Sequence, residues 1–286
     1  MSQDPLDAPT VAPASLSASE AIGACRLIRK LGEGGFGELW AATDRQLKHK
    51  RPAFKFCFRA DRVRSLKREA TLFRLLKEKV GDHPGIVSVH EVYFDKPPFY
   101  IGMDYVEGKD LRTWWNMSGG AKSVPLPVRL EIVAQIADAL HAAHGAGVIH
   151  RDIKPSNVLI EGRGVAPEEI RARLTDFGIG QVVSEEILKG VTGMGFTQTT
   201  MQSGAGGQSG TYIYMAPELF AGKPASIQSD IYSLGVVLYQ LVLGDLSRPV
   251  TMDWILPDPL LRQDLMRCFA SDPAERFATA GHLAHN

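Results

Sequence analysis

The chain has 286 residues, 44% of them hydrophobic and 22% charged, and Lys+Arg 32 balance Asp+Glu 32 for a formal net charge of +0. This composition suits one large globular domain or two lobes, and it gives no global basic field that would attract nucleic acid or anionic lipid. The three cysteines, Cys25, Cys57 and Cys268, are far apart and odd in number, which argues against a disulfide framework or a zinc cluster and favours reduced thiols.

The first segment, residues 1–22, is rich in Pro, Ala and Ser. It lacks the charged start and apolar core of a signal peptide, so we predict a disordered leader. No run of residues is apolar for long enough to cross a bilayer. We therefore expect neither a nucleic-acid partner nor a membrane segment in this chain.

Several strands and one helix are predicted in the first half. Residues 25–44 alternate apolar and polar side chains around a glycine cluster, which predicts two strands joined by a flexible turn. Residues 51–59 form a short strand candidate. Residues 61–80 place apolar side chains at helical spacing opposite a basic face and predict a helix. Residues 86–95 and 99–106 predict two more strands with a turn between them.

The second half is predicted to be mainly helical. A periodic helix opens after Pro127 and ends at Gly145, residues 229–244 read as a buried helix, and residues 258–270 and 277–286 read as short amphipathic helices. Strands followed by helices indicate an α+β chain with segregated lobes. A glycine-rich stretch without periodicity, residues 184–210, is either a functional or a disordered loop.

Two features of the first half suggest phosphate chemistry. Gly32, Gly34 and Gly37 have the spacing GxGxxG, which lets backbone N–H groups approach a phosphate. A strand pattern rather than a helix follows, which disfavours a dinucleotide site and favours a strand–loop–strand flap. Lys55 lies within an apolar strand, so it either reaches solvent from an edge strand or pairs with an anion. Glu69, near the buried face of the predicted helix, is the candidate partner.

Polar residues crowd the stretch VIHRDIKPSN, Val148 to Asn157, which is anchored by apolar residues on both sides. With one histidine and no cysteine it is a poor transition-metal site, so a solvated turn and a catalytic loop remain as readings. Asp176 ends an apolar strand, a natural place for Mg²⁺, which prefers hard oxygen ligands. Farther along, Glu218 follows a proline, and Arg276 is its candidate partner.

The order of these motifs along the chain matches that of a known protein family. The order of glycine loop, strand lysine, helix glutamate, HRDxKxxN, DFG and APE resembles the Ser/Thr branch of the eukaryotic-type protein kinases, in particular its bacterial members, from about Cys25 to His282. The resemblance implies a bilobal kinase fold of the α+β class and a cytoplasmic enzyme. A β-rich N-lobe over 23–104 would follow the leader at 1–22, and a helical C-lobe would span 105–286 with the hinge near 104–108.

The resemblance also implies ATP and Mg²⁺ (or Mn²⁺) as cofactors and gives roles to single residues. Asp152 would orient the substrate hydroxyl, Lys154 would steady the γ-phosphate, and Asn157 and Asp176 would hold metal. Lys55, paired with Glu69, would hold the α- and β-phosphates. The other implied cofactor contacts are the glycine loop with Phe36 at its tip and the adenine and ribose positions: Leu31, Gly32, Gly34, Gly37, Ala53, Met103, Asp104, Val106, Asp110 and Leu159.

Other implied roles concern positioning and regulation. His150 and Phe177 would stack in an apolar column with Phe73 and Val89, Asp230 would anchor the catalytic loop, and Thr211 would bond across to it. Arg151 would bind a phosphate on the activation segment, whose candidate acceptors are Thr192, Thr197, Thr199, Thr200, Ser203 and Ser209. The expected partners are protein substrates with Ser or Thr acceptors and a second copy of the chain, for autophosphorylation.

The chain departs from the family pattern mainly between Gly244 and Pro259, where a docking helix is usual and this stretch is short. No departure removes a catalytic group. The leading reading is therefore a non-specific serine/threonine protein kinase. The alternatives are a pseudokinase that serves as a nucleotide-binding scaffold and a small-molecule kinase of the same fold.

Overall fold

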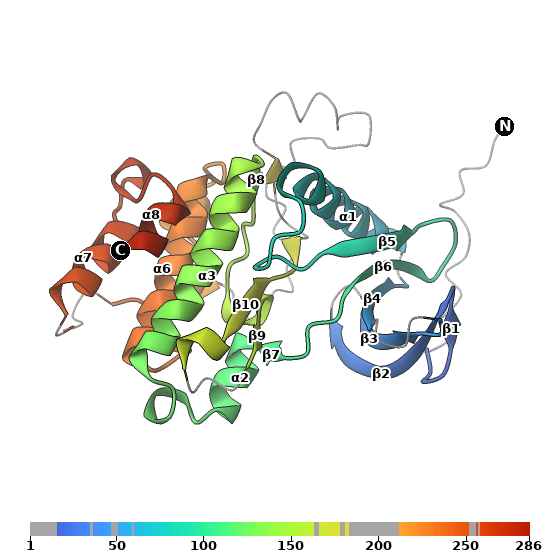
Figure 1. Cartoon of the computed structure of the whole chain (residues 1–286). Helices are drawn as coiled ribbons and strands as arrows, with labels where there is room; N and C mark the ends of the chain where they lie inside the picture. The colour runs from blue at the N-terminus through green and yellow to red at the C-terminus, as the bar shows by residue number, and fades with distance from the viewer. Residues whose placement is uncertain are drawn as a thin grey trace. The chain divides into compact units, whose positions relative to one another are not determined.

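In a computed structural model of the chain, the described residues are 16–34, 37–46, 51–58, 60–162, 166–177, 181–182, 212–251, 256 and 258–286. The chain divides into two compact units (Figure 1). The N-unit comprises residues up to Lys77 and Val87–Tyr105, and the C-unit comprises Glu78–Ile86 and Val106–Asn286. Within the described residues, no helix combines the length and apolar character needed to cross a membrane.

The N-unit is built on one six-stranded antiparallel sheet of order β1-β2-β3-β4-β6-β5. Its strands are β1 (Ala21–Ile22), β2 (Cys25–Gly34), β3 (Gly37–Asp44), β4 (Pro52–Cys57), β5 (Val89–Tyr93) and β6 (Phe99–Asp104). Helix α1 (Ala60–Val80) follows β4 and agrees with the helix predicted at 61–80. One face of the sheet buries an apolar cluster of Leu16, Leu27, Trp40, Ala42, Phe54 and Phe56.

The N-unit differs from the expected N-lobe, residues 23–104, at both of its ends. Residues 16–22, predicted as part of a disordered leader, pack on the sheet because Leu16 enters the apolar cluster and β1 pairs with β2. Leu27 also exchanges backbone hydrogen bonds with Ser19 and Glu20 at 2.8 and 2.9 Å. The N-unit ends at Tyr105 rather than at residue 104. The short segment 78–86 belongs to the C-unit, which a single linear boundary does not capture.

The described part of the C-unit is mainly helical, as expected, and carries five short strands. Figure 1 shows α3 at its centre with α6 and α8 packed beside it. The helices are α2 (Leu111–Met117), α3 (Leu126–Gly145), α5 (Pro217–Phe220), α6 (Ile227–Leu243), α7 (Pro259–Cys268) and α8 (Ala280–His285). The strands β7 (Lys109–Asp110), β9 (Val158–Glu161) and β10 (Arg171–Leu174) form one sheet, and β8 (Val148–Ile149) pairs with β11 (Gln181–Val182).

Helix α6 is the buried helix that the sequence predicts. Ser226 and Ser229 form a capping box at its start, and Gly244 ends it in a left-handed conformation with φ of 82°. Helix α3 opens at Leu126 after Pro125, slightly earlier than expected. Of the stretch between Gly244 and Asp258, the structure describes residues 245–251 and 256, and these are not helical.

Helices α6 and α7 approach closely at Gly235. A Cβ atom at this position would lie 2.5 Å from the Cβ of Cys268, which is fully buried. We expect Gly235→Ala to lower the free energy of unfolding by about 1–3 kcal/mol, because the helices must separate. Gly145→Ala at the end of α3 is the control, since nothing lies within 4 Å of its added Cβ. Urea denaturation measures both; equal stability of the two variants would contradict the close packing.

Candidate active site

The glycine-rich stretch forms the expected strand–loop–strand. Strand β2 pairs with β3 up to the partners Gly34 and Gly37, so no helix follows the glycines. Gly37 has a φ of 143°, and a Cβ atom there would lie 2.2 Å from the carbonyl oxygen of Phe56. The position therefore requires glycine. Phe36, expected at the tip, lies outside the described residues.

Lys55 and Glu69 form the expected ion pair within the N-unit. Strand β4 lies between β3 and β6, so the edge-strand reading of Lys55 is wrong. The Lys55 Nζ lies 2.8 and 2.9 Å from the two carboxylate oxygens of Glu69, and Glu69 is only 2% exposed. Burial makes each charge dependent on the other, because a lone buried charge costs several kcal/mol.

The predicted adenine contacts in the N-unit lie on neighbouring strands. Ala53 and Met103 are direct cross-strand partners on β4 and β6, and both are buried. Leu31 on β2 is half-buried. Asp104 ends β6, where its N–H donates to Ser88 O at 2.9 Å and its carboxylate lies 2.5 Å from His90 Nε2.

The predicted contacts in the C-unit form a second small group. Asp110 and Leu159 are cross-strand partners on β7 and β9, and Val106 is buried before them. The carboxylate of Asp110 accepts a hydrogen bond from Thr113 N at 3.0 Å and so caps α2. Asp110 therefore caps α2 in addition to the ribose contact that the resemblance implies.

The catalytic loop places two polar side chains, those of Lys154 and Asn157, around the carboxylate of Asp152. Its Oδ2 accepts hydrogen bonds from Asn157 Nδ2 at 2.9 Å and from Lys154 Nζ at 2.7 Å. Asn157 Nδ2 also donates to the backbone oxygen of Asp152 at 2.8 Å. The other carboxylate oxygen, Oδ1, accepts no hydrogen bond from the described residues. The loop therefore fixes Oδ2 of Asp152 with two hydrogen bonds and leaves Oδ1 of the same carboxylate available to a substrate.

Asp176 lies beside this loop through a backbone link. Thr175 N donates to Asn157 O at 3.1 Å, which places the end of β10 against the loop. Asp176 itself has a left-handed φ of 61°, an uncommon conformation for a residue with a side chain. The next residue, Phe177, is fully buried, and its ring centroid lies 4.5 Å from that of His150.

His150 is fully buried and connects the loop to Thr175. Its Nδ1 accepts from Asp152 N at 3.3 Å, and its Nε2 lies 3.0 Å from Thr175 O, so the neutral ring with hydrogen on Nε2 satisfies both contacts. Burial lowers the pKa of His150 below its ordinary value of 6.5, outweighing the nearby carboxylates. The residue is thus a structural link, as the sequence analysis expects.

This pKa shift predicts a pH dependence of stability. The unfolded chain binds a proton at His150 below about pH 6.5 while the folded chain does not, so stability falls as the pH drops through that value. In urea denaturation between pH 7.5 and 5.5, His150→Phe should weaken this loss by up to about 1.4 kcal/mol per pH unit relative to wild type. Identical pH slopes for the two proteins would refute the assignment.

Asp230, in the first turn of α6, anchors the catalytic loop as expected. Its two carboxylate oxygens accept the N–H groups of His150 and Arg151, each at 2.8 Å, and the residue is fully buried. Arg151 has a left-handed φ of 70°, which costs roughly 1–2 kcal/mol for an L-residue, so the anchor is needed to hold it. His144 Nε2 also contacts Asp230, at 2.9 Å.

His144 is a functional candidate that the motif pattern of the sequence did not indicate. It lies three residues after His141 on α3; His144 is buried, whereas His141 is exposed. Hydrophobic periodicity alone places His144 on the apolar face of α3. A histidine on the apolar face of a predicted helix indicates a buried polar contact, and this signal was present in the sequence.

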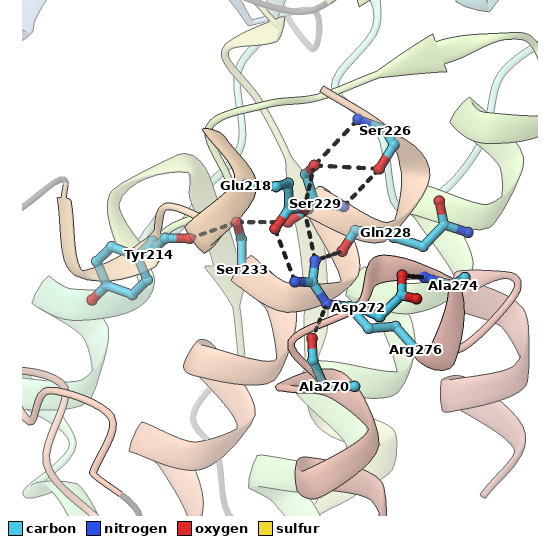
Figure 2. Close-up of polar contacts among 10 residues, drawn as sticks. All are labelled: Tyr214, Glu218, Ser226, Gln228, Ser229, Ser233, Ala270, Asp272, Ala274 and Arg276. Carbon is cyan, nitrogen blue, oxygen red and sulfur yellow. Dashed lines mark hydrogen bonds and ion pairs between the residues drawn. The ribbon is translucent and has the colours of Figure 1, made fainter. Parts of the chain in front are cut away.

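A buried ion pair fixes the APE segment (Figure 2). Arg276 binds Glu218 through two nitrogens at 2.7 and 2.9 Å, as the sequence analysis predicts. Arg276 also donates to the backbone oxygens of Gln228 and Ala270, both at 3.0 Å, and Ser229 Oγ donates to Glu218 at 2.9 Å. Burial opposes ionisation of Glu218, but the hydrogen bonds from Arg276 and Ser229 lower its pKa on balance.

Several predicted residues remain untested by this geometry. Thr211 and the six candidate phosphoacceptors at residues 192–209 lie outside the described residues. Phe73 and Val89 belong to the N-unit, so their stacking with His150 and Phe177 of the C-unit stays a prediction.

The oxygen ligands in the C-unit suit Mg²⁺ bound together with a nucleotide. The described residues contain no group of three or more His, Cys, Asp and Glu that would hold a metal by themselves. Asn157 and Asp176 offer an amide and a carboxylate oxygen. This set fits Mg²⁺, which usually keeps waters and completes its shell with substrate phosphates.

The N-unit carries an acid-paired lysine beside a glycine hairpin, and the C-unit carries the Asp–Lys–Asn loop. Groups of both kinds are used by kinases in phosphoryl transfer. The protein kinase domain family matches residues 25–253, so the chain belongs to the protein kinase family. The serine/threonine-protein kinase PknD of Mycobacterium tuberculosis is 34% identical over 92% of this chain and 39% of its own. PknA of the same species is 32% identical over 92% of this chain and 60% of its own.

Other relatives widen this comparison. The tyrosine-protein kinase MasK of Myxococcus xanthus is 31% identical over 90% of this chain and 41% of its own. The crystal structure of the PknI kinase domain of M. tuberculosis has a TM-score of 0.62 and 25% identity, over 95% of this chain and 98% of that one. The chain thus spans only part of the length of its curated relatives.

Proposed function

We propose that this domain transfers the γ-phosphoryl group of Mg-ATP to serine and threonine hydroxyls of proteins. The observation that carries the proposal is the arrangement of Asp152, Lys154 and Asn157, in which one carboxylate oxygen is fixed by two donors. The oxygen left over has the position and chemistry to accept a hydroxyl proton. Lys154 is typical of kinases that act on serine and threonine.

The remaining groups would bind and orient the nucleotide. Lys55, held by Glu69, would neutralise the α- and β-phosphates, and the glycine hairpin would cover them. Asn157 and Asp176 would hold Mg²⁺ or Mn²⁺. The metal, when bound, supplies positive charge that offsets the charge developing on the phosphates.

The acceptors of this reaction are proposed to be proteins, including a second copy of the chain. The segment from Tyr212 to Glu218, which the Glu218–Arg276 pair ties to the C-unit, would be the surface on which a polypeptide substrate lies. Arg151 is half-buried in the loop and would bind a phosphate added to residues 184–210. A cytoplasmic location is proposed on the basis of the bacterial kinase relatives.

The test is incubation with Mg²⁺, γ-labelled ATP and a generic protein substrate, followed by phosphoamino-acid analysis. We expect labelled phosphoserine or phosphothreonine from wild type and a large reduction from Lys55→Met. Labelled phosphotyrosine would instead point to the activity named for MasK. Nucleotide binding without any transfer would identify a pseudokinase, and transfer to small molecules alone would identify the small-molecule reading.

A further inference from the structure

We infer that Lys30 is a positioning residue that holds the glycine hairpin over the phosphates of the nucleotide, an inference that rests on the proposed function. Lys30 lies on β2, and its Nζ is 2.7 Å from Glu33 Oε2 and 2.6 Å from Glu38 Oε1. Glu33 lies within the GxGxxG stretch, and Glu38 directly follows Gly37 on β3. One ammonium group therefore joins both strands of the hairpin close to its turn.

The two carboxylates that Lys30 binds are direct neighbours across the hairpin. Glu33 and Glu38 are cross-strand partners, next to the closing pair Gly34 and Gly37. Residues directly opposite one another in an antiparallel pair share one face of the sheet, and like charges there destabilise the pairing. The ammonium group between them replaces this repulsion with two ion pairs. The hydrogen bonds to Glu33 and then Glu38 accordingly raise the pKa of Lys30 above its ordinary value.

Glu38 is also fixed by the apolar cluster of the N-unit. Its Oε2 accepts a hydrogen bond from Trp40 Nε1 at 2.8 Å, and Trp40 is buried in that cluster. Burial opposes ionisation of Glu38, but the hydrogen bonds from Lys30 and Trp40 lower its pKa on balance. The Glu38 side chain is 13% exposed, so water screens its ion pair less than it screens an ordinary surface pair. The contacts thus run from the packed core of the sheet to the glycine turn.

These contacts lie on the face of the sheet opposite to the Lys55 side chain. Leu39, between Glu38 and Trp40, is the cross-strand partner of Gly32 on one side and of Lys55 on the other. Successive side chains of a strand alternate between the two faces of a sheet. The ion pairs of Lys30 therefore leave the face that carries the Lys55 ammonium group clear. They hold, from behind, the row of residues that joins the first glycine of the hairpin to Lys55.

Regular strand pairing does not fix the hairpin by itself. The register of β2 against β3 shifts between Lys30 and Gly32, at the start of the glycine stretch. Such an irregularity bends a strand and interrupts its ladder of hydrogen bonds, so side-chain contacts must hold the pairing beyond it. The ion pairs of Lys30 span this point and reach Glu33 and Glu38. Loss of Lys30 would leave two opposed carboxylates, loosen the end of the hairpin and displace the N–H groups that would meet the phosphates.

The experiment measures binding of Mg-ATP, Mg-ADP and adenosine to the full chain by isothermal titration calorimetry. Lys30→Met removes the ammonium group, Lys30→Arg keeps a cation, and Lys30→Met/Glu33→Gln also removes one of the two opposed charges. Arg26→Met is the matched control, because Arg26 is an exposed cation on the same strand that lies opposite Thr43. Amide hydrogen exchange of β2 and β3 without nucleotide reports on the hairpin itself.

We expect Lys30→Met to raise Kd for Mg-ATP and Mg-ADP about three- to tenfold, to leave Kd for adenosine within about 1.5-fold, and to speed exchange in β2 and β3. Adenosine has no phosphate for the hairpin to cover, whereas a general loss of structure would weaken all three ligands. Lys30→Arg should stay within about twofold of wild type, and the double variant should bind Mg-ATP about two- to threefold more tightly than Lys30→Met.

Several results would overturn the proposal. Mg-ATP binding or amide exchange unchanged in Lys30→Met would do so, as would an equal loss of affinity for adenosine and ATP. A loss in Arg26→Met as large as in Lys30→Met would assign the effect to net charge and would also overturn it. If wild type binds nucleotide but transfers no phosphate, the proposed function fails, and the Kd values still decide the role of Lys30.

Discussion

Asp152→Asn is expected to lower kcat for phosphoryl transfer by about 10²- to 10⁴-fold while the domain stays folded. Asparagine keeps the size of aspartate, and its carbonyl oxygen can still accept from Lys154 and Asn157 as Oδ2 does now. The other oxygen becomes an NH₂ group, which donates a hydrogen bond instead of accepting the hydroxyl proton. The variant thus removes one acceptor and leaves the surrounding contacts in place.

Steady-state kinetics and thermal unfolding measure this effect. KM for ATP should change little, because Asp152 is assigned to the acceptor hydroxyl and not to the nucleotide. Asp138→Asn is the matched control, since its side chain is 65% exposed and lies 3.5 Å from His83 Nε2, on α3 and away from the catalytic loop residues. Asp152→Asn protein that transfers phosphate at the wild-type rate would remove Asp152 from the reaction.

The sequence predicted those parts of the fold whose pattern is local. The glycine hairpin, the helix that carries Glu69 and the buried helix α6 follow from periodicity and turn residues, and they lie within a few residues of where they were expected. The sequence also named Glu69 as the candidate partner of Lys55, which the hydrogen bond of 2.8 Å between them confirms, although the strand pattern left a solvent-reaching edge lysine as the other reading.

The missed features depend on contacts between distant segments. The packing of Leu16 on the sheet joins a Pro- and Ala-rich segment to a cluster built from later strands, and composition alone indicated disorder there. The role of His144 depends on its contact with Asp230, which lies more than 80 residues away in the sequence. The strand order of the sheet shows that Lys55 lies on a central strand, β4. The sequence could not show this, because periodicity does not distinguish a central strand from an edge strand.

Arg276→Met is expected to lower the free energy of unfolding by about 3–5 kcal/mol, because it leaves the buried carboxylate of Glu218 without its cation. Methionine fills much of the same volume, so the loss reports charge and hydrogen bonding more than packing. Three groups would lose their hydrogen bonds from Arg276 at once: the carboxylate of Glu218 and the backbone carbonyls of Gln228 and Ala270 (Figure 2).

The double variant Glu218→Gln/Arg276→Met separates the pair from its surroundings. Because each single change strands the other partner, the double variant should lose less stability than the sum of the two single losses, by about 0.5–3 kcal/mol in a double-mutant cycle. Urea denaturation of the four proteins supplies the numbers. Strictly additive losses would mean that Glu218 and Arg276 stabilise the C-unit independently, which their bidentate contact at 2.7 and 2.9 Å contradicts. The loss should also extend to catalysis, because the Tyr212–Glu218 segment that would support the substrate is tied to α6 through this pair and through Ser229.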